Sequence, residues 1–354
     1  MDETTWPGGS GAGTINTLHY WPKGKDYIVA LAAFEDKLIV FGKQAILIYS
    51  SPSVIASLAL SDTIVGTGCI ARDSVQHIGS DIIFLSESGI RSLRKSLITS
   101  KSPVDELSLS IRDLLNLYIS AGTLSKTRSA YNAKEGFYLL SIVGSSTTTS
   151  FYFDVKNFVS SQQFQNSDGS SSNAVPVRTS IWTGFPVHAL AYGRNGTLYA
   201  SFRDGSNEVV ASYAGYYDGN AQAYSIKYAS PWIDLADPTG SGESGSFWKI
   251  PKQANVITVG SGTYQVTTTL AFDFDSASSS QTVNVSSSTQ LSEWGLAEWG
   301  LDEWNAQSKV LKQSKFQIGR YGQHMRIGLS IPVMGYEISV QKIDLFMKRG
   351  RSSI

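Results

Sequence analysis

Three tryptophans and three glutamates recur at intervals of five residues, and their type and spacing suggest a binding function. The segment reads Leu-Ser-Glu-Trp-Gly, Leu-Ala-Glu-Trp-Gly, Leu-Asp-Glu-Trp-Asn, which places indoles at Trp294, Trp299 and Trp304 and carboxylates at Glu293, Glu298 and Glu303. A period of five matches neither a helix nor a strand, so only successive turns can bring the indoles to one surface. Tryptophan is a frequent anchor at protein–protein interfaces, and aromatic rings beside carboxylates also suit a sugar platform. We favour a subunit interface, with the sugar platform as the alternative.

Two aspartate pairs raise the question of glycoside hydrolysis, which needs two carboxyl groups about 5 to 9 Å apart across a cleft. Asp273 and Asp275 are predicted on one face of a strand, and Asp234 and Asp237 lie in a proline-containing turn. Sequence spacing does not fix the distance between the carboxyl groups. Solvation of a strand end or binding of a structural cation is the simpler interpretation, so we predict no catalytic residue and no enzymatic activity.

The remaining motifs for chemistry are incomplete. The four histidines are His19, His77, His188 and His324, and none has metal-ligand spacing to another or to the single cysteine, Cys69. The glycines of residues 9–13 lack the strand, the Gly-Lys-Ser/Thr end and the helix of a phosphate loop, and no Gly-x-Ser-x-Gly elbow occurs. We therefore expect neither a metal nor a cofactor.

Composition points to a β-rich, turn-rich protein. Lys plus Arg equals Asp plus Glu at 29, charged residues are 16%, and the chain has 32 glycines. A formal charge of zero argues against a strongly basic nucleic-acid binder. The acidic start is unlike a secretory signal, and the longest apolar run, near residues 27–34, is far shorter than the ~20 residues that span a bilayer. We expect a soluble protein made in a reducing cytosol.

Pairs of short apolar strands joined by turns recur from residue 27 onward. They are predicted at 37–41 with 45–49, 81–85 with 89–93, 136–140 with 150–154, and 197–201 with 208–212. When Leu38, Ile82, Phe137 and Leu198 are aligned, the spacings are 44, 55 and 61 residues; β-propeller blades repeat at roughly 40 to 50. The longer intervals contain a predicted helix near 102–120, with Leu107, Ile111, Leu114 and Tyr118 on one face, and a polar loop at 160–174. Asn195-Gly196 predicts a two-residue hairpin turn.

The last third of the chain has a different pattern. Residues 264–274 alternate strictly between apolar and polar, which predicts a strand with one buried face. Residues 327–331 alternate in the same way, Gly335 begins a turn, and a return strand starts at Ile338 with a β-bulge near Lys342. The predicted fold is all-β, with an N-terminal arm (1–26), β-propeller-like blades with one short inserted helix (27–220), and an appended antiparallel β domain with the tryptophan repeats (221–354).

Three stretches resemble the tail nozzle (tail tubular, or stabilisation) proteins of short-tailed bacteriophages. They are residues 68–93, with Phe84-Leu-Ser followed by Gly89-Ile; Trp248-Lys249 leading to Val266–Asp275 and the tryptophan repeats; and Ile318-Gly-Arg-Tyr-Gly322 leading to Lys348-Arg-Gly-Arg351. Together they cover about one third of the chain. These stretches are structural patterns and not active-site signatures.

The resemblance implies a propeller-based structural subunit whose homohexameric ring extends and gates the DNA-ejection channel. It implies contacts with a tail adaptor ring above and with needle or fibre proteins below, and phage DNA that passes through the channel without specific binding. The protein would be assembled in the host bacterial cytoplasm and reside in the virion. The alternative function is a carbohydrate-binding or glycoside-hydrolysing β-propeller.

Overall fold

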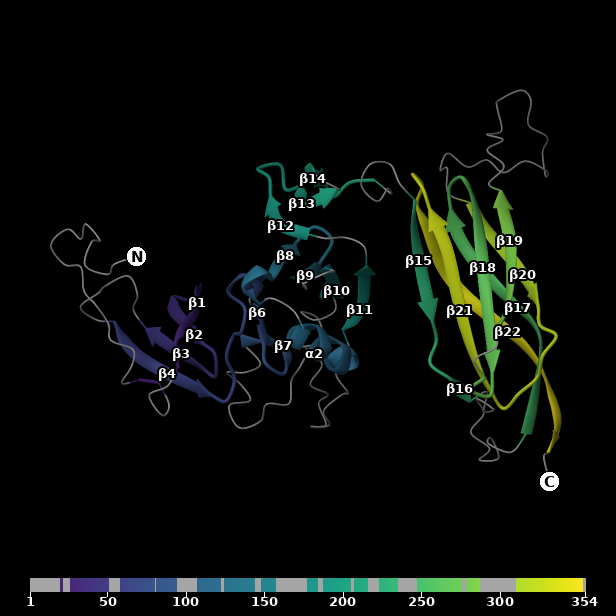
Figure 1. Ribbon diagram of the computed structural model, residues 1–354, viewed down its shortest axis with the longest axis horizontal. Coiled ribbons are helices and arrows are strands. Elements are labelled where there is room, and N and C mark those ends of the chain that lie inside the picture. The colour runs from purple at the N-terminus through teal and green to yellow at the C-terminus, as the bar shows by residue number, and fades with distance from the viewer. Residues whose placement is uncertain are drawn as a thin grey trace, which may run out of the picture. The chain divides into compact units, whose positions relative to one another are not determined.

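The chain divides into two compact units, residues 1–213 (unit 1) and 214–354 (unit 2). The computed structural model describes residues 20–21, 26–50, 58–79, 81–93, 107–121, 124–143, 148–156, 177–183, 187–204, 207–215, 223–234, 247–275, 278–286 and 310–352 (Figure 1). The division lies close to the boundary at 220/221 that the sequence predicts. Most of the predicted arm (1–26) and the whole loop at 160–174 lie outside the described residues. No helix in the described part of the chain has the length and apolar character needed to cross a membrane.

Unit 1 consists of successive antiparallel sheets whose strands pair in chain order (Figure 1). The first holds β1 (Ile28–Phe34), β2 (Lys37–Gly42), β3 (Ala45–Ser50) and β4 (Ala59–Val65), and the second holds β5 (Gln76–Ile78), β6 (Asp81–Ser86) and β7 (Gly89–Ser92). The third holds β8 (Arg128–Asn132), β9 (Phe137–Val143), β10 (Thr148–Asp154) and β11 (Arg178–Thr183), and the fourth holds β12 (Val187–Tyr192), β13 (Leu198–Asp204) and β14 (Asn207–Ser212). Four consecutive meanders of three or four strands are the blades of a β-propeller-like fold.

The alignment of the repeats is confirmed by the strand order. Leu38, Ile82, Phe137 and Leu198 lie in β2, β6, β9 and β13, and each of these is the second strand of its sheet. All four predicted strand pairs form with the expected partners. Two of these second strands are readable because they are buried on both faces: every residue of β6 is buried, and only Val143 of β9 is partly exposed.

Two hydrophobic clusters fill most of unit 1. One packs β1, β2 and β3 against β6 around Ile39, Phe41 and Phe84, with the Phe41 and Phe84 rings 5.0 Å apart. The other packs β6 and β7 against β9 and β10, with Tyr138 and Phe151 fully buried. Each cluster joins neighbouring sheets, as expected when blades stack face to face.

The inserted helix is confirmed, and of the four residues predicted to share one face only Leu114 is wrong, because Leu107, Ile111 and Tyr118 lie in or pack against the second cluster. A 3₁₀ turn, η6 (Leu109–Ile111), leads into α2 (Arg112–Ala121), and a second 3₁₀ turn, η7 (Leu124–Lys126), follows. Leu115 is fully buried in the second cluster, whereas Leu114 is 36% exposed. The buried stripe therefore runs from Ile111 through Leu115 to residues 118 and 119, the i, i+4, i+7, i+8 face of an α-helix.

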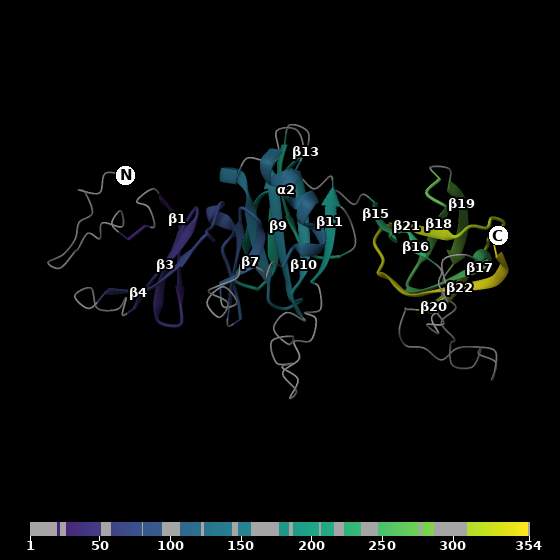
Figure 2. The same cartoon turned by 90° about the horizontal axis from the view of Figure 1, so that it is seen from below.

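Unit 2 is a sandwich of two antiparallel sheets. One sheet orders β15 (Tyr224–Ala229), β21 (His324–Val333), β18 (Thr263–Phe272) and β19 (Ser278–Ser286), and β16 (Ile233–Asp234) also pairs with β21. The other orders β20 (Val310–Gln317), β17 (Phe247–Gly260) and β22 (Ile338–Ser352). Figure 2 shows the two sheets as separate layers. Their facing side chains form one core, which includes Val256, Val266 and Phe316.

The predicted details of unit 2 are mostly confirmed. Inward residues alternate along β18 and β21, Gly335 has φ +74°, and a register shift in β17–β22 pairing leaves Gln341 unpaired next to Lys342, which is the predicted bulge. β22 pairs with β17 of the opposite sheet and not with β21, so the turn at Gly335 carries the chain between layers. Phe274 does not continue the strand: it has φ +61° and is 64% exposed.

The Asn195-Gly196 turn is one residue longer than predicted. Gly196 has φ +75°, but the amide of Gly196 donates to the carbonyl of Gly193 and the amide of Gly193 donates to the carbonyl of Thr197. This is a type I turn followed by a left-handed glycine, a common three-residue hairpin loop. Asn195 instead accepts a hydrogen bond from the Thr197 amide through its side chain.

Candidate functional site

A cavity of about 810 Å³ lies in unit 1 between the first strands of its sheets. Its lining comes from β1, η5 (Arg72–Ser74) and the residue after it, β5, β8 and β12. The lining residues are Ile28, Val29, Ala30, Leu31, Ala32, Arg72, Asp73, Val75, Gln76, His77, Arg128, Ser129, Ala189 and Leu190. The volume lies within the range of ligand-binding pockets, about 300 to 1,000 Å³.

The edges of four strands face this cavity. β1, β5, β8 and β12 each stand at one end of their sheet's strand order. Side chains of a strand alternate between its faces, yet residues 28–32 line the cavity consecutively, as do 75–77. The cavity therefore runs along strand edges, where backbone groups point. In a β-propeller, the first strands of the blades border the central axis in the same way.

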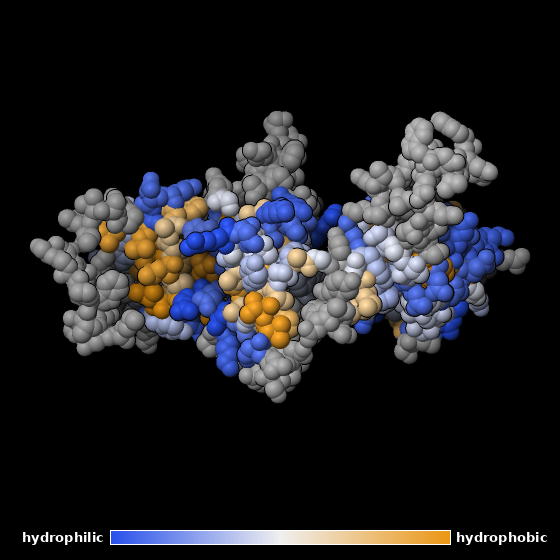
Figure 3. All heavy atoms as spheres, turned by 90° about the horizontal axis from the view of Figure 1, so that it is seen from above, coloured by the Kyte–Doolittle hydropathy of each residue, from blue (hydrophilic) through white to orange (hydrophobic). Residues whose placement is uncertain are grey.

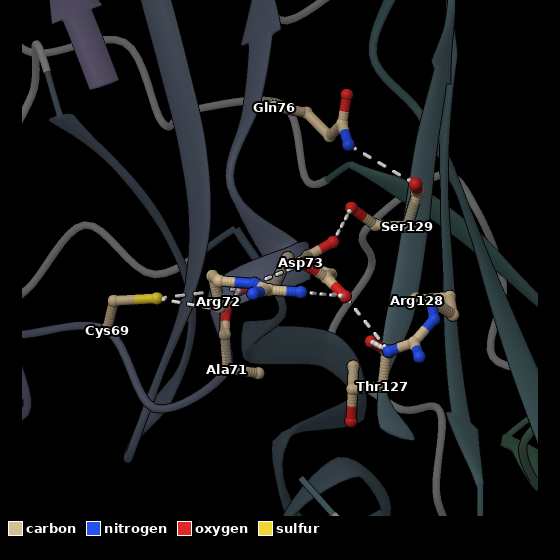
Figure 4. A network of polar contacts seen from close by, with 9 residues as sticks. Cys69, Ala71, Arg72, Asp73, Gln76, Thr127, Arg128 and Ser129 are labelled. Atoms are coloured by element: carbon tan, nitrogen blue, oxygen red, sulfur yellow. Dashed lines mark hydrogen bonds and ion pairs between the residues drawn. The ribbon is translucent and has the colours of Figure 1, made fainter. Parts of the chain in front are cut away.

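Asp73 organises the polar end of the cavity (Figure 4). Its Oδ1 accepts from Nε of Arg72 at 2.8 Å, and its Oδ2 accepts from Nη1 of Arg128 at 2.9 Å. The Asp73 and Arg128 side chains are 29% and 31% exposed, whereas Arg72 is 76% exposed. Two guanidinium groups share one carboxylate, so this group of three carries a net charge of one positive unit.

Backbone contacts tie the same turn to the third sheet. The Ser129 hydroxyl donates to the carbonyl of Asp73 at 2.6 Å, and the Gln76 side-chain amide donates to the carbonyl of Ser129 at 3.2 Å. Arg128 also donates to the carbonyl of Thr127 at 2.9 Å. Figure 4 shows these groups between η5 and β8. The polar end of the cavity is thus held from two adjacent sheets.

Cys69 and Tyr138 support the turn from behind. The Cys69 thiol donates to the carbonyl of Ala71 at 3.1 Å, and the Tyr138 hydroxyl donates to the carbonyl of Ser74 at 2.8 Å. The Ser74 hydroxyl donates to Ala71 and accepts from the Leu85 amide. Burial raises the pKa of the Cys69 thiol to about 11 and raises the pKa of Tyr138 further above its ordinary range. Cys69 is therefore a protonated structural residue and not a nucleophile.

Sequence reasoning did not single out Arg72, Asp73 or Arg128. A signal was nonetheless present: Asp73 and Arg128 stand nine residues before Ile82 and Phe137, the aligned positions of adjacent repeats. Opposite charges at equivalent positions of neighbouring blades are close in space when blades are adjacent. The ion pair across 55 residues follows from that equivalence.

The residues predicted as an interface lie outside the described part of the chain. Trp294, Trp299 and Trp304 and the glutamates beside them are in residues 287–309, and His19 and Asp237 also fall in undescribed segments. The interface hypothesis therefore stays a prediction.

The prediction that Asp273 and Asp275 share a strand face is wrong. Asp273 has φ +50° beyond the end of β18, and its Oδ1 accepts from the amides of Gln323 and His324 at 2.8 and 2.9 Å. The amide of Asp275 donates to the carbonyl of Phe272. Asp273 thus closes the turn at a strand end by accepting hydrogen bonds from backbone amides.

The described histidines lie in different places. His77 borders the cavity, and Nδ1 of His188 is 3.6 Å from Oε2 of Glu208. The ring centres of His324 and Phe274 are 5.1 Å apart. Within the described residues, no three His, Cys, Asp or Glu side chains are grouped as metal ligands would be.

Comparison with known proteins gives little further information. No protein-family model matches the chain, and no curated protein matches it. Among solved structures, the chain is similar to an engineered GH43 glycoside hydrolase with endo-xylanase and exo-arabinofuranosidase activity. The two are 9% identical over 88% of this chain and 85% of that chain, with a TM-score of 0.24. That score carries no argument about this chain; the propeller-like class rests on the strand order of unit 1.

Proposed function

We propose that this protein is a structural subunit of a bacteriophage tail nozzle, which assembles into an oligomeric ring that extends and gates the DNA-ejection channel. The observation that supports a structural role is that the edge strands of both units expose apolar side chains. An exposed apolar strand at a sheet edge can pair with a strand of another chain.

Edge strands of each unit have large apolar side chains in solvent. In unit 1, Ile28 and Leu31 of β1 are 48% and 60% exposed. In unit 2, Tyr228 of β15 is 52% exposed, and Phe346 and Met347 of β22 are exposed as well. Figure 3 shows apolar side chains gathered over the part of unit 1 that holds β1–β4. A subunit of a larger assembly would cover such strands.

The resemblance of residues 68–93 and of the two C-terminal stretches connects this general role to tail nozzles. On this proposal the subunit forms a homohexamer, contacts an adaptor ring above and needle or fibre proteins below, and resides in the virion. DNA passes through the ring without specific binding, because tight phosphate contacts would slow its ejection. The protein has no catalytic activity of its own, and Trp294, Trp299 and Trp304 contribute to the contacts between subunits.

The cavity of unit 1 favours a second candidate, a carbohydrate-binding or glycoside-hydrolysing propeller. Hydrolysis needs two carboxyl groups at a set separation, and among the described lining residues Asp73 is the single carboxylate. It is engaged by two guanidinium groups. Binding of a sugar is therefore the form of this alternative that suits the cavity better.

Solution mass together with negative-stain imaging separates the two. We expect purified protein to form rings with an axial channel, alone or after mixing with the adaptor of its phage. A protein that stays monomeric under both conditions and binds glycans on an array would contradict the proposal and support the alternative.

A further inference from the structure

Strand β1 is a sheet edge with which, among the described strands, only β2 pairs. Its sequence, Ile-Val-Ala-Leu-Ala-Ala-Phe, contains no charged residue and no proline, which are the usual devices that keep an edge from pairing. A bulge at Val29 is followed by regular pairing from Ala30 to Phe34. This edge can accept a further strand.

The cavity lies along that same edge. Five consecutive residues of β1, Ile28–Ala32, line it, and in an extended strand they span about 16 Å. Leu31 of β1 and Leu190 of β12 supply apolar surface, and Leu31 is 60% exposed. An extended peptide of about five residues matches the length of this edge and can place alternate side chains against apolar surface.

The charge at the cavity's polar end selects the kind of peptide. The Arg72 side chain lines the cavity and is 76% exposed, and Asp73 fixes its guanidinium through Nε at 2.8 Å. A carboxylate approaching this exposed guanidinium can form a charge-assisted hydrogen bond. A lysine at that position meets two guanidinium groups and is disfavoured.

We propose that the cavity of unit 1 binds an extended, acidic peptide segment of a partner protein, which adds a strand to the edge of β1 and places a carboxylate at Arg72. Main-chain hydrogen bonds to β1 supply affinity, and Arg72 supplies the preference for an acidic residue. This binding mode does not require that the protein be a tail subunit, so the two proposals can fail separately.

The test uses the full chain and fluorescein-labelled hexapeptides, measured by fluorescence anisotropy. The probe is Thr-Val-Glu-Val-Thr-Val, compared with the same peptide carrying Lys in place of Glu and with a version N-methylated at alternate residues, which lacks donors along one edge. We expect saturable binding of the acidic peptide, at least about tenfold weaker binding of the lysine peptide, and loss of binding on N-methylation.

Matched variants locate the site on the protein. Leu31→Asp places a charge on the β1 edge, and Val65→Asp makes the same change in β4, the opposite edge of the same sheet, where Val65 is 66% exposed. Arg72→Gln removes the positive charge that is proposed to bind the peptide carboxylate, and the ion pair between Asp73 and Arg128 remains. Arg194→Gln is the matched control and changes an exposed arginine in the β12–β13 turn. Leu31→Asp should weaken binding at least about tenfold and Arg72→Gln at least about fivefold. Val65→Asp and Arg194→Gln should not change it.

Each alternative result overturns the proposal. Absence of binding to the acidic peptide excludes the site, and equal loss in Leu31→Asp and Val65→Asp shows a general charge effect. Undiminished binding of the N-methylated peptide excludes strand addition. Full displacement by sodium hexanoate at matched concentration shows a small-anion site in place of a peptide site. Circular dichroism of each variant verifies that the fold is retained.

Discussion

Gly68 is the position where a single methyl group should damage unit 1 most clearly. The amide of Gly66 donates to the carbonyl of Gln44 at 2.9 Å, and the amide of Cys69 donates to the carbonyl of Gly42 at 2.8 Å. These bonds hold residues 66–69 against the turn between β2 and β3. A Cβ at Gly68 would overlap the carbonyl oxygen of Gly42 and the carbonyl group of Lys43, all of them backbone atoms.

The expected cost of Gly68→Ala follows from what must move. A side chain can rotate away from a new methyl group, but the β2–β3 turn can yield only if its hydrogen bonds with residues 66–69 lengthen. Overpacking of this kind costs about 2 to 3 kcal/mol. For a unit of 213 residues, that corresponds to a fall of roughly 4 to 12 °C in the midpoint of thermal unfolding.

Two other glycines provide controls. Gly66 has φ +82° with no atom within 4 Å of an added Cβ, so Gly66→Ala reports backbone strain alone, about 1 kcal/mol. Gly319 in unit 2 has neither a positive φ nor a near neighbour, and Gly319→Ala should be neutral within about 0.5 kcal/mol.

Hydrogen–deuterium exchange with mass spectrometry is the suitable assay, because peptides from unit 2 serve as an internal standard. Gly68→Ala should speed exchange in β2, β3 and β6 and leave β18 and β21 unchanged. If Gly68→Ala is no less stable than Gly66→Ala, the steric reasoning is refuted.

Three further predictions concern other parts of the chain. Gly89 has φ +132°, so Gly89→Val should lower the free energy of unfolding by about 1 to 3 kcal/mol; an unchanged urea midpoint contradicts this. Burial raises the pKa of the Cys69 thiol from 9.0 to about 11, so the protonated thiol contributes fully to the free energy of unfolding below pH 9. This contribution is lost as the pH rises toward 11, by up to about 3 kcal/mol. The free energy of unfolding should therefore fall less steeply between pH 9 and 11 in Cys69→Ala than in the parent. Trp299→Ala should give folded monomers that no longer form rings, because a tryptophan anchor contributes about 2 kcal/mol or more and a hexamer repeats the loss at every interface; circular dichroism with solution mass tests this, and a folded variant that still assembles refutes it.

The second strands of the repeats were predictable from sequence, whereas the first strands β5 and β12 were not. β6 and β9 are almost wholly buried, four of the six residues of β2 are buried, and all three strands read as apolar runs. β5 has three residues and begins with glutamine, and five of the six residues of β12 are exposed or partly so. A strand whose edge borders a cavity needs no apolar pattern, so periodicity does not reveal it.

The errors in unit 2 and in α2 have local causes. Phe274 extends the alternating pattern of β18, but the carboxylate of Asp273 accepts two backbone amides and turns the chain there. In α2, Leu114 and Leu115 are adjacent leucines, and the pattern alone did not decide which faces the core. Leu115 lies in the same buried cluster as Leu140 and Phe151 of the neighbouring sheet, and that tertiary packing decides which leucine is buried.

The candidate site could not be predicted from sequence because its residues come from different repeats and from an exposed edge strand. Asp73 and Arg128 come from different repeats, and each looks like an ordinary surface charge until the two blades are adjacent. β1 reads as a core strand because it is apolar, yet Ile28 and Leu31 face solvent. An apolar strand left exposed at an edge costs solubility, and a bulge at Val29 gives it little protection. Among the described strands, β1 is therefore the one from which an interaction with another chain is best inferred.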